Sequence, residues 1–543
     1  MSELPAGLQP AEEVVPRDSG SVVVLRQGEK GREVLLGVRS RKSRFMPGHW
    51  AFPGGVMEEQ DAGGFDRCAV RELQEETGLE IPVEQLMPIG ERITPPMFPV
   101  RFKTVFFVAE IDEPRGELTP PTSEIEELMF VRPDEVVERW SRGGCAVPPP
   151  VLPLLRALVD TIDRSHEEIV EALTAVNALE QATPRIEFIP EVWMLPVKTA
   201  TMPPATHTNV WMPGGERFVV IDPGMTDESE RERLFGSMRR RIELGQPVEA
   251  VLLTHRHQDH ISGVADLCAA FDLPLYAHPF VLEHPAVAAV ADRRPLEDGA
   301  VLDLGGLQLR AHYTPGHDPG HIAYEGVDRG WVVVGDLISG ISTILIEPQT
   351  GDMDDYLESL EKMRRGGFRQ LLPGHGPPLP AKAFDHLIAH RLKREQRVLD
   401  GVAASTPIAD IARLAYADQP GLPQRLIELQ TRAHLKRLER LERVTAEVDD
   451  RWSRLESTAA TIERKLRDAF KPEQFELQDD SAQHAGHRGA TSGGGHFQVK
   501  IVSDAFDGMS RLERHRAIYA ALNGMVGNAI HALAIQAQTP KEL

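Results

Sequence analysis

The chain has 543 residues, 41% of them hydrophobic and 26% charged, a composition typical of several globular domains in one polypeptide. Its formal net charge of −22 excludes a protein that coats nucleic acid through general basicity, so any nucleic-acid contact must be local. Only three cysteines occur, Cys68, Cys145 and Cys268, which argues against a disulfide framework and against a cysteine-based zinc site.

The first of four predicted globular segments, the N-terminal segment, runs from about residue 18 to 175. Runs rich in β-branched and aromatic residues, bounded by turn residues, predict strands at 21–25, 34–38 and 104–111. A helix is predicted at 66–77. This order of strands and helix is the scaffold on which the first group of polar residues lies.

The predicted helix carries three glutamates, Glu72, Glu75 and Glu76, which share one face because they stand at positions i, i+3 and i+4. Clustered carboxylates repel one another unless a cation neutralises them, and hard oxygen ligands suit Mg²⁺ or Mn²⁺. The alternative interpretation is a solvated acidic helix face.

The residues around this helix resemble the Nudix hydrolase family. Phe52-Pro53-Gly54-Gly55 and the run from Arg71 to Leu79 match the Nudix box, with Asp61 where the family has a glutamate. Between Gly55 and Arg71 the chain is two residues longer than the pattern. The resemblance implies an α/β/α sandwich whose three glutamates bind the metal and position a water to cleave a nucleoside diphosphate linkage.

A second motif suggests the substrate. Leu35 to Ser40, Arg44, Gly48 and the run 52–55 fit the coenzyme A diphosphatase motif, although Gly37 replaces a threonine. The resemblance implies coenzyme A or an acyl derivative as substrate. Arg39 and Arg44 are then candidate partners for phosphate oxygens, and structural pairing with acidic residues is the alternative.

The central segment, from about residue 186 to 384, contains short apolar strands that each lead into a polar loop. These strands are predicted at 218–221, 250–253 and 331–334. After the second of them, the run 254–260 holds three histidines and an aspartate, the ligand types that zinc prefers in catalytic sites.

An extended loop presents alternate side chains on one side, so His255 and His257 can share one metal ion. Asp259 and His260 can then turn towards a second ion. A lone histidine is more often a core or solvated residue, but four ligand-type residues in this order after an apolar strand favour a metal site.

The central segment resembles the metallo-β-lactamase superfamily, whose signature H-x-H-x-D-H lies at 255–260. The other motifs of the superfamily lie at 222–224, before this signature, and at 314–317, 335–336 and 373–376 after it. The resemblance implies an αββα sandwich with two zinc ions, or iron or manganese, at one sheet edge. It implies three sets of ligands: His255, His257 and His317 for the first ion, Asp259, His260 and His375 for the second, and Asp336 as the bridge. Asp259 also counts as a catalytic residue, and His321 is expected beside the ligands. Two cations acidify a water that attacks an ester, thioester, amide or phosphodiester.

A third segment, from about 385 to 448, is predicted to be all-helical, with helices at 408–417 and 424–444. It resembles the winged-helix extension of β-lactamase-like hydrolases, a group that includes endoribonucleases. Five basic residues of its second helix are candidates for RNA or DNA phosphate contacts: Arg432, Lys436, Arg437, Arg440 and Arg443. Interleaved glutamates favour a solvated face instead.

The C-terminal segment, from about 455 to 543, resembles BolA, through motifs at 480–484, 496–497, 502–508, 514–516 and 531–533. The resemblance implies an αββααβ fold akin to type II KH domains. It also implies a [2Fe–2S] cluster shared with a monothiol glutaredoxin, held by His531 and a loop histidine, His487 or His484. A DNA-binding role is also attributed to the family, and local hydrogen bonding of these histidines is the alternative.

Two hypotheses follow for the whole chain. The first is a multifunctional metal-dependent hydrolase with a coenzyme A-like small-molecule substrate and a BolA appendage. The second is a regulatory scaffold or nucleic-acid-binding protein whose central segment acts as an endoribonuclease. The complete ligand sets favour the first. Neither a signal peptide nor a run of about 18 apolar residues is found, so we expect a cytoplasmic location and no membrane span.

Overall fold

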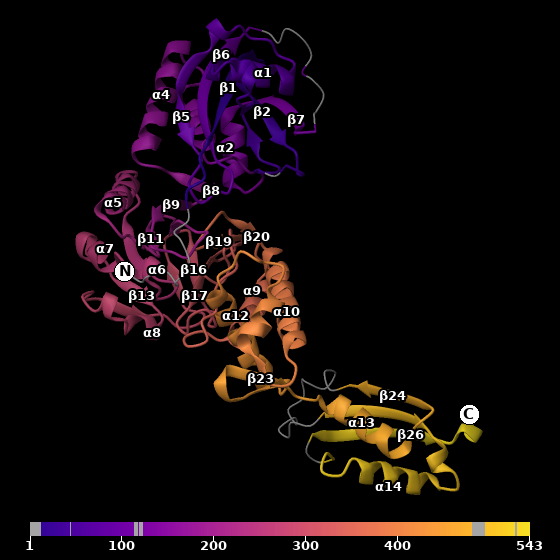
Figure 1. The fold of residues 1–543 in the computed structure, drawn as a ribbon. Coiled ribbons are helices and arrows are strands. Elements are labelled where there is room, and N and C mark those ends of the chain that lie inside the picture. The colour runs from indigo at the N-terminus through magenta and orange to yellow at the C-terminus, as the bar shows by residue number, and fades with distance from the viewer. Residues whose placement is uncertain (1–11, 44, 113–117, 119–122, 481–494, 527–528) are drawn as a thin grey trace. The chain divides into compact units, whose positions relative to one another are not determined.

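The computed structural model describes residues 12–43, 45–112, 118, 123–480, 495–526 and 529–543 (Figure 1). The chain divides into two structural units, residues 1–392 and residues 393–543. Within the described ranges, every helix is too short or too polar to cross a lipid bilayer.

The N-terminal segment is built around one mixed sheet. Its strands are β1 (Arg17–Gly28), β2 (Gly31–Arg39), β3 (Trp50–Ala51), β4 (Gly54–Val56), β5 (Met87–Ile93), β6 (Phe102–Ile111) and β7 (Ile125–Val131). The strand order is β3-β2-β1-β6-β5, with β4 paired to β1 and β7 paired to β2. Strands β1 and β6 run parallel, and the three strands predicted from the sequence lie within β1, β2 and β6.

Alternation along β1 explains why helices cover both faces of this sheet. Val22 and Val24 pack with α1 (Phe65–Thr77), whereas Val23 and Leu25 face the opposite way. The second face is covered by α2 (Pro133–Ser141), α3 (Leu152–Thr161) and α4 (His166–Ala182). Since successive strand side chains point to opposite faces, a strand that is apolar throughout needs cover on both sides. The predicted α/β/α sandwich is confirmed, and Figure 1 shows α1 and α4 on either side of the sheet.

The central segment contains two sheets. The first has the order β14-β13-β12-β11-β10-β9-β8, and its strands are β8 (Ile186–Ile189), β9 (Val192–Lys198), β10 (His207–Pro213), β11 (Phe218–Ile221), β12 (Val248–Leu252), β13 (Leu275–Ala277) and β14 (Arg293–Pro295). The second has the order β15 to β20, and its strands are β15 (Val301–Asp303), β16 (Gln308–Tyr313), β17 (Ile322–Gly326), β18 (Trp331–Gly335), β19 (Gln370–Pro373) and β20 (Leu379–Pro380).

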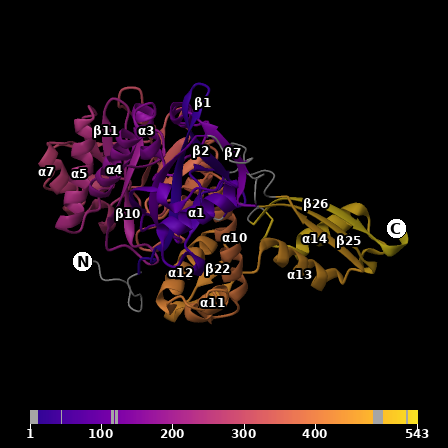
Figure 2. The same ribbon diagram turned by 90° about the horizontal axis from the view of Figure 1, so that it is seen from above.

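The two central sheets pack face to face around a core that includes Trp211 and Val219 from one sheet and Tyr324 and Val333 from the other. A second core lies between the first sheet and helices α5 (Glu228–Glu243) and α7 (Val264–Phe271). Figures 1 and 2 show these two helices on the outer side of that sheet. Helix α9 (Met353–Arg364) lies on the opposite side of the two sheets from α5 and α7 in Figure 1. This is the predicted αββα sandwich, and its strand ends carry the polar loops.

The third segment is not all-helical, so this prediction was wrong. Besides the helices α10 (Ala383–Gly401), α11 (Ile408–Ala415) and α12 (Gln424–Arg440) it contains a small sheet. Strand β21 (Thr406–Pro407) of this sheet lies between α10 and α11, and β22 (Val444–Ala446) and β23 (Arg451–Arg454) follow α12. Helix α12 ends before residue 444 because Glu442 takes the left-handed conformation, with φ of 54°. Strands of two to four residues carry too little alternation to be recognised from sequence. Helices followed by a hairpin match the element order expected of a winged helix.

The C-terminal segment has the helices α13 (Thr458–Phe470) and α14 (Arg511–Ala521) and the strands β24 (Gln474–Asp479), β25 (Gly495–Val502) and β26 (Ile530–Gln538). Strand β25 pairs with β24 antiparallel and with β26 parallel. A core of Ile462 and Leu466 from α13, Ile518 from α14 and Phe497 and Val499 from β25 holds the helices on the sheet. A short helical turn at Asp504–Phe506 stands where the expected αββααβ order has its second helix.

Candidate active sites

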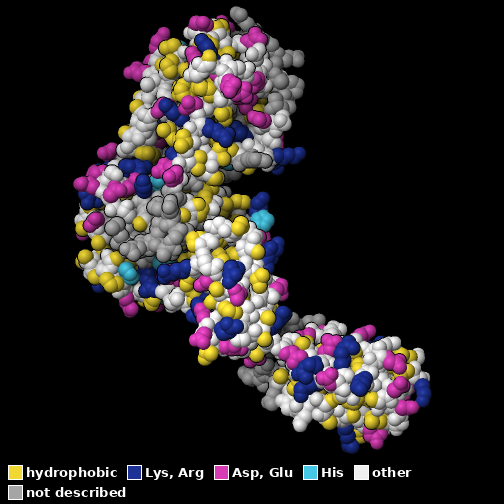
Figure 3. Space-filling view, in the orientation of Figure 1, with side chains coloured by type: hydrophobic (Ala, Val, Ile, Leu, Met, Phe, Trp, Pro, Cys, Tyr) yellow, Lys and Arg dark blue, Asp and Glu magenta, His cyan; other side chains and the backbone are white. Residues whose placement is uncertain are grey.

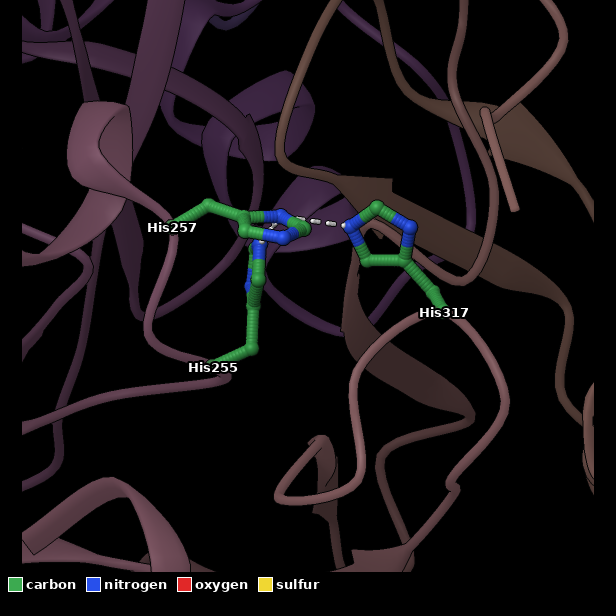
Figure 4. Close-up of side chains that lie close together, drawn as sticks. All are labelled: His255, His257 and His317. Atoms are coloured by element: carbon green, nitrogen blue, oxygen red, sulfur yellow. Dashed lines mark hydrogen bonds between the residues drawn. The ribbon is translucent and has the colours of Figure 1, made fainter. Parts of the chain in front are cut away.

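Three histidines of the central segment point their rings at one another (Figure 4). His257 Nδ1 lies 3.0 Å from His255 Nε2 and 2.9 Å from His317 Nε2. His255 and His257 follow β12 directly, while His317 comes from the loop between β16 and β17. Three imidazole nitrogens around one point form a ligand set for a divalent cation.

A second set lies beside the first. The helical turn α6 (Gln258–Ile261) begins right after His257 and carries Asp259 and His260, and the His260 ring centroid lies 4.2 Å from that of His255. His375 Nε2 lies 3.3 Å from His260 Nε2 and 3.3 Å from Asp259 Oδ2. His255 and His257 thus group with His317, and Asp259 and His260 group with His375, while a third group joins His255 and His260 to Asp222.

Asp336, which follows β18, stands between the two sets. Its Oδ1 lies 3.5 Å from Nε2 of both His260 and His375, and its Oδ2 lies 3.7 Å from His317 Nε2. These distances are too long for normal hydrogen bonds, and no other group in the described part of the chain donates to the buried Oδ1. A buried carboxylate oxygen left in this way fits a cation as its partner. The donor set as a whole fits two divalent cations.

Each of four ligand rings is oriented by a contact at its Nδ1 atom. Nδ1 lies 2.9 Å from an oxygen in each of four rings: His255 with Thr254 Oγ1, His260 with Asp222 Oδ2, His317 with the Leu345 carbonyl and His375 with the His207 carbonyl. Such contacts fix ring orientation and leave Nε2 free for a metal.

Asp222 is the functional residue that sequence reasoning missed, because it was noted only as part of a motif at a strand end. Its carboxylate also accepts hydrogen bonds from the Thr254 backbone N–H and hydroxyl. It therefore links the end of β11 to the start of the histidine loop. A polar residue directly after a buried strand was the available signal.

Burial holds the pKa of His255 well below its usual range, whereas Asp336 and Asp259 raise the pKa of His260 and of His375. Burial, helped by the neighbouring His257, lowers the pKa of His317 to about 4. Burial likewise lowers the pKa of His321 to about 3. His321 lies outside the three ligand groups, and its Nδ1 is 2.8 Å from Thr314 Oγ1. Neutral imidazole is the form that coordinates a cation.

The three glutamates of the N-terminal segment line a cavity of about 950 Å³ with Arg39, Gly54 and Gly55. Glu76 is only 6% exposed, and its Oε2 accepts a hydrogen bond from the Gly54 N–H. Burial raises the pKa of Glu76 to about 7. A Cβ on Gly55 would lie 2.4 Å from the Glu72 carboxyl carbon, so a glycine is needed for this close approach.

A solvated acidic face does not describe these glutamates, since only Glu75 has a largely exposed side chain. Figure 3 shows acidic side chains gathered near α1 and β2, with Lys and Arg side chains next to them. Among the described residues, however, every group of three ligand atoms within 4.8 Å lies in the central segment. The three glutamates thus line one cavity, but their carboxylate oxygens do not all lie within 4.8 Å of one another.

Asp61 turns out to face Arg71 and not the cavity. Its carboxylate receives two hydrogen bonds from Arg71, of 2.9 and 3.0 Å. The same guanidinium also reaches Glu72, Glu75 and the Val56 carbonyl. Arg71 therefore ties the loop before α1 to the glutamate face, and Asp61 anchors that arginine. Arg39 lines the cavity, whereas Arg44 lies outside the described residues.

The remaining predicted site residues fall in the second unit. Arg432 pairs with Asp450 and Arg437 with Glu395, so these two basic candidates are ion-paired within the protein. His531 is exposed on β26, and its ring centroid lies 5.2 Å from that of His496. The loop histidines His484 and His487 lie outside the described residues.

Family models match three parts of the chain: a NUDIX domain over residues 16–149, the metallo-beta-lactamase superfamily over residues 204–375 and a BolA-like protein over residues 466–542. The chain combines a NUDIX domain, a metallo-β-lactamase domain and a BolA domain. It is a hydrolase, since its NUDIX and metallo-β-lactamase domains both belong to hydrolase families.

Three relatives illustrate the range of similarity. The chain is 26% identical over 271 residues to the Beta-lactamase-like protein 2 homolog of Drosophila melanogaster. The aligned region covers 47% of this chain and 90% of that protein. It is 31% identical over 196 residues to the Atrochrysone carboxyl ACP thioesterase of Aspergillus fumigatus, which covers 36% and 58%. The BolA domain is 46% identical over 83 residues to BolA-like protein 1 of Homo sapiens, which covers 15% and 58%.

Proposed function

We propose that the metallo-β-lactamase domain hydrolyses thioesters and that the NUDIX domain cleaves the diphosphate linkage of coenzyme A or its acyl derivatives. The proposed hydrolysis by the metallo-β-lactamase domain is supported above all by the position of Asp336. One carboxylate oxygen of Asp336 faces His375 and the other faces His317. We assign His255, His257 and His317 to one cation, and Asp259, His260 and His375 to the other.

Cations held by these ligands would acidify a water and stabilise the negative charge that develops during hydrolysis. The protein's own contribution is orientation. Thr254, Asp222 and two backbone carbonyls hold the ligand rings so that their Nε2 atoms converge, and the four rings are buried. This arrangement suits hydrolysis of an acyl or phosphoryl bond equally well.

The choice of a thioester rests on two supports. One relative of the metallo-β-lactamase domain bears the name of a thioesterase that acts on an acyl carrier protein. The NUDIX domain of the same chain carries the motif fitted to coenzyme A at 35–55, with Arg39 in the cavity wall. A coenzyme A thioester contains both bonds that these two domains would cut.

For the NUDIX domain we assign Glu72, Glu75 and Glu76 to a Mg²⁺ or Mn²⁺ ion, and Arg39 and Arg44 to phosphate oxygens. The support is local. Buried Glu76 and half-buried Glu72 face a cavity that Arg39 also lines, and a cation is the natural partner of carboxylates removed from water.

Octanoyl-coenzyme A is expected to yield two separable sets of products with the full chain. Thiol release reports thioester hydrolysis, and 3′,5′-ADP release reports diphosphate cleavage. Removal of divalent metal by chelation and desalting is expected to abolish both, because both sites depend on cations. Zinc, iron or manganese should restore thiol release, and Mg²⁺ or Mn²⁺ should restore 3′,5′-ADP release.

The control is a single-stranded RNA offered to the same metal-loaded protein. Cleavage of RNA with an intact thioester would contradict the thioesterase proposal and support the endoribonuclease alternative. Release of 3′,5′-ADP that survives chelation would contradict the metal assignment of the NUDIX domain.

For the BolA domain we propose a shared [2Fe–2S] cluster with a monothiol glutaredoxin, with His531 as one ligand. Mixing the full chain with a cluster-loaded monothiol glutaredoxin is expected to change the visible absorption of the cluster, because imidazole replaces a thiolate ligand. His531→Ala should abolish this change, while His515→Ala on α14 should leave it intact. Equal spectra for both variants would contradict the assignment.

A further inference from the structure

The cavity that holds the NUDIX glutamates is not made by the NUDIX domain alone. Ile186 and Phe188 line it, and both belong to β8, the edge strand of the first metallo-β-lactamase sheet. Arg233 of α5 lines it as well. These residues lie outside the NUDIX match at 16–149, so the neighbouring domain supplies part of the cavity wall.

An aromatic row crosses from one domain to the other along this wall. Phe45 contacts Phe102 and Phe98, with ring centroids 5.1 and 6.0 Å apart, and Phe98 contacts Phe188 at 6.0 Å. All four rings line the cavity. Aromatic faces of this kind are suited to apolar groups, and the same cavity is also lined by glutamates and arginines.

Phe188 is held firmly in this wall. The preceding residue, Glu187, is buried and accepts hydrogen bonds from Arg185 and from Arg156 on α3. Because alternate residues of a strand point to opposite faces, this anchor directs Phe188 to the other face of β8. A second ion pair, between Arg240 and Glu180, joins α5 to α4.

The lining also offers a cation with unused hydrogen-bonding capacity. Arg92 donates through Nε to Asn177, but its buried Nη2 has no hydrogen-bond partner among the described residues. An arginine in this state suits an anionic ligand such as a phosphate. The cavity thus combines carboxylates, free guanidinium capacity and an aromatic row within about 950 Å³.

We infer that the NUDIX site selects nucleoside diphosphates that carry an apolar acyl or alkyl group, and that Phe188 of the metallo-β-lactamase domain helps to bind that group. This inference rests on the proposed diphosphate cleavage. In that reaction water adds to one phosphorus, the P–O–P bond breaks, and the two phosphate products carry the nucleotide and the acyl-bearing arm separately. Phe188 contacts the arm and takes no part in the bond changes.

The test compares free coenzyme A with S-octyl-coenzyme A, whose thioether the metallo-β-lactamase domain cannot hydrolyse. The full chain is expected to favour the octyl compound in kcat/KM for 3′,5′-ADP release. Phe188→Ala should lower kcat/KM for S-octyl-coenzyme A by about tenfold and change that for free coenzyme A less than about twofold, since a lost apolar contact affects only the substrate that makes it.

Phe271→Ala is the matched control, because Phe271 is a half-buried phenylalanine of the same domain that packs on Phe235 and does not line the cavity. Phe188→Leu keeps an apolar wall and should recover most of the selectivity if Phe188→Ala loosens the fold. An equal loss on both substrates in Phe188→Ala, or no octyl preference in the unmodified chain, would overturn the inference.

Binding of S-octyl-coenzyme A to the Glu76→Gln chain by calorimetry separates this inference from the proposed function. If no Glu76-dependent cleavage occurs but binding weakens about tenfold in the Phe188→Ala, Glu76→Gln chain, the diphosphatase proposal fails and the Phe188 contact stands. If cleavage occurs without any effect of Phe188, the Phe188 contact fails and the diphosphatase stands. If neither cleavage nor binding is found, both fail.

Discussion

Asp336→Asn is expected to lower kcat for thioester hydrolysis by about a thousandfold or more, which corresponds to roughly 4 kcal/mol of lost transition-state stabilisation. The carboxylate faces both histidine sets, with Oδ1 towards His260 and His375 and Oδ2 towards His317. Asparagine keeps the size of the side chain but replaces one oxygen ligand by an amide nitrogen that cannot bind a cation. It also removes the negative charge between two cations.

The measurement is kcat for thiol release, together with metal content by mass spectrometry. Metal content is expected to fall from about two ions per chain to about one or fewer. Asp298→Asn is the control, because Asp298 is a carboxylate of the same domain that pairs with Lys362. Full activity and full metal content in Asp336→Asn would contradict the assignment of two metal ions to this site. A thermal melt shows whether the variant remains folded.

Glu76→Gln is expected to reduce 3′,5′-ADP release by at least about a hundredfold while thiol release stays within about twofold of the unmodified chain. Glu76 is buried and accepts a hydrogen bond from the Gly54 N–H. Glutamine has the same shape and keeps an oxygen for that hydrogen bond, so the fold should persist. What it removes is the charge that would bind Mg²⁺ or Mn²⁺.

Both activities are measured on the same sample, so each domain serves as the reference for the other. Glu80→Gln is the matched control, because Glu80 is an exposed carboxylate just beyond the end of α1. Undiminished 3′,5′-ADP release in Glu76→Gln would remove Glu76 from the ligand set. A parallel loss of thiol release would show that the two sites are coupled, which the separate ligand sets do not predict.

The candidate ligands were predictable as a group because four of the seven lie at 255–260. In this run an extended loop brings His255 and His257 within 3.0 Å of each other, and the helical turn α6 carries Asp259 and His260. Local geometry of this kind follows from chain order alone. Asp222 was missed as an orienting residue since its role depends on where β11 ends relative to β12, and that is a property of sheet pairing.

The structure explains why Asp61 can stand where the Nudix family has a glutamate. Its carboxylate binds Arg71, and Arg71 in turn contacts Glu72 and Glu75. The short strands β22 and β23 were missed for another reason: three or four residues do not establish a period, and only their pairing with each other identifies them as strands.

The sequence by itself determined the hydrolytic chemistry, because ligand types at short spacings act through local backbone geometry. The five histidines and two aspartates that it named lie in loops, a turn and the short helix α6 of the central segment, and the three glutamates lie on α1. Only the tertiary structure decided what surrounds each site. Phe45, Phe98 and Phe188 are far apart in the chain and show no shared pattern, yet domain packing brings them into one wall of the NUDIX cavity. Contacts between distant segments depend on how whole sheets pack, and no local period in the sequence records that.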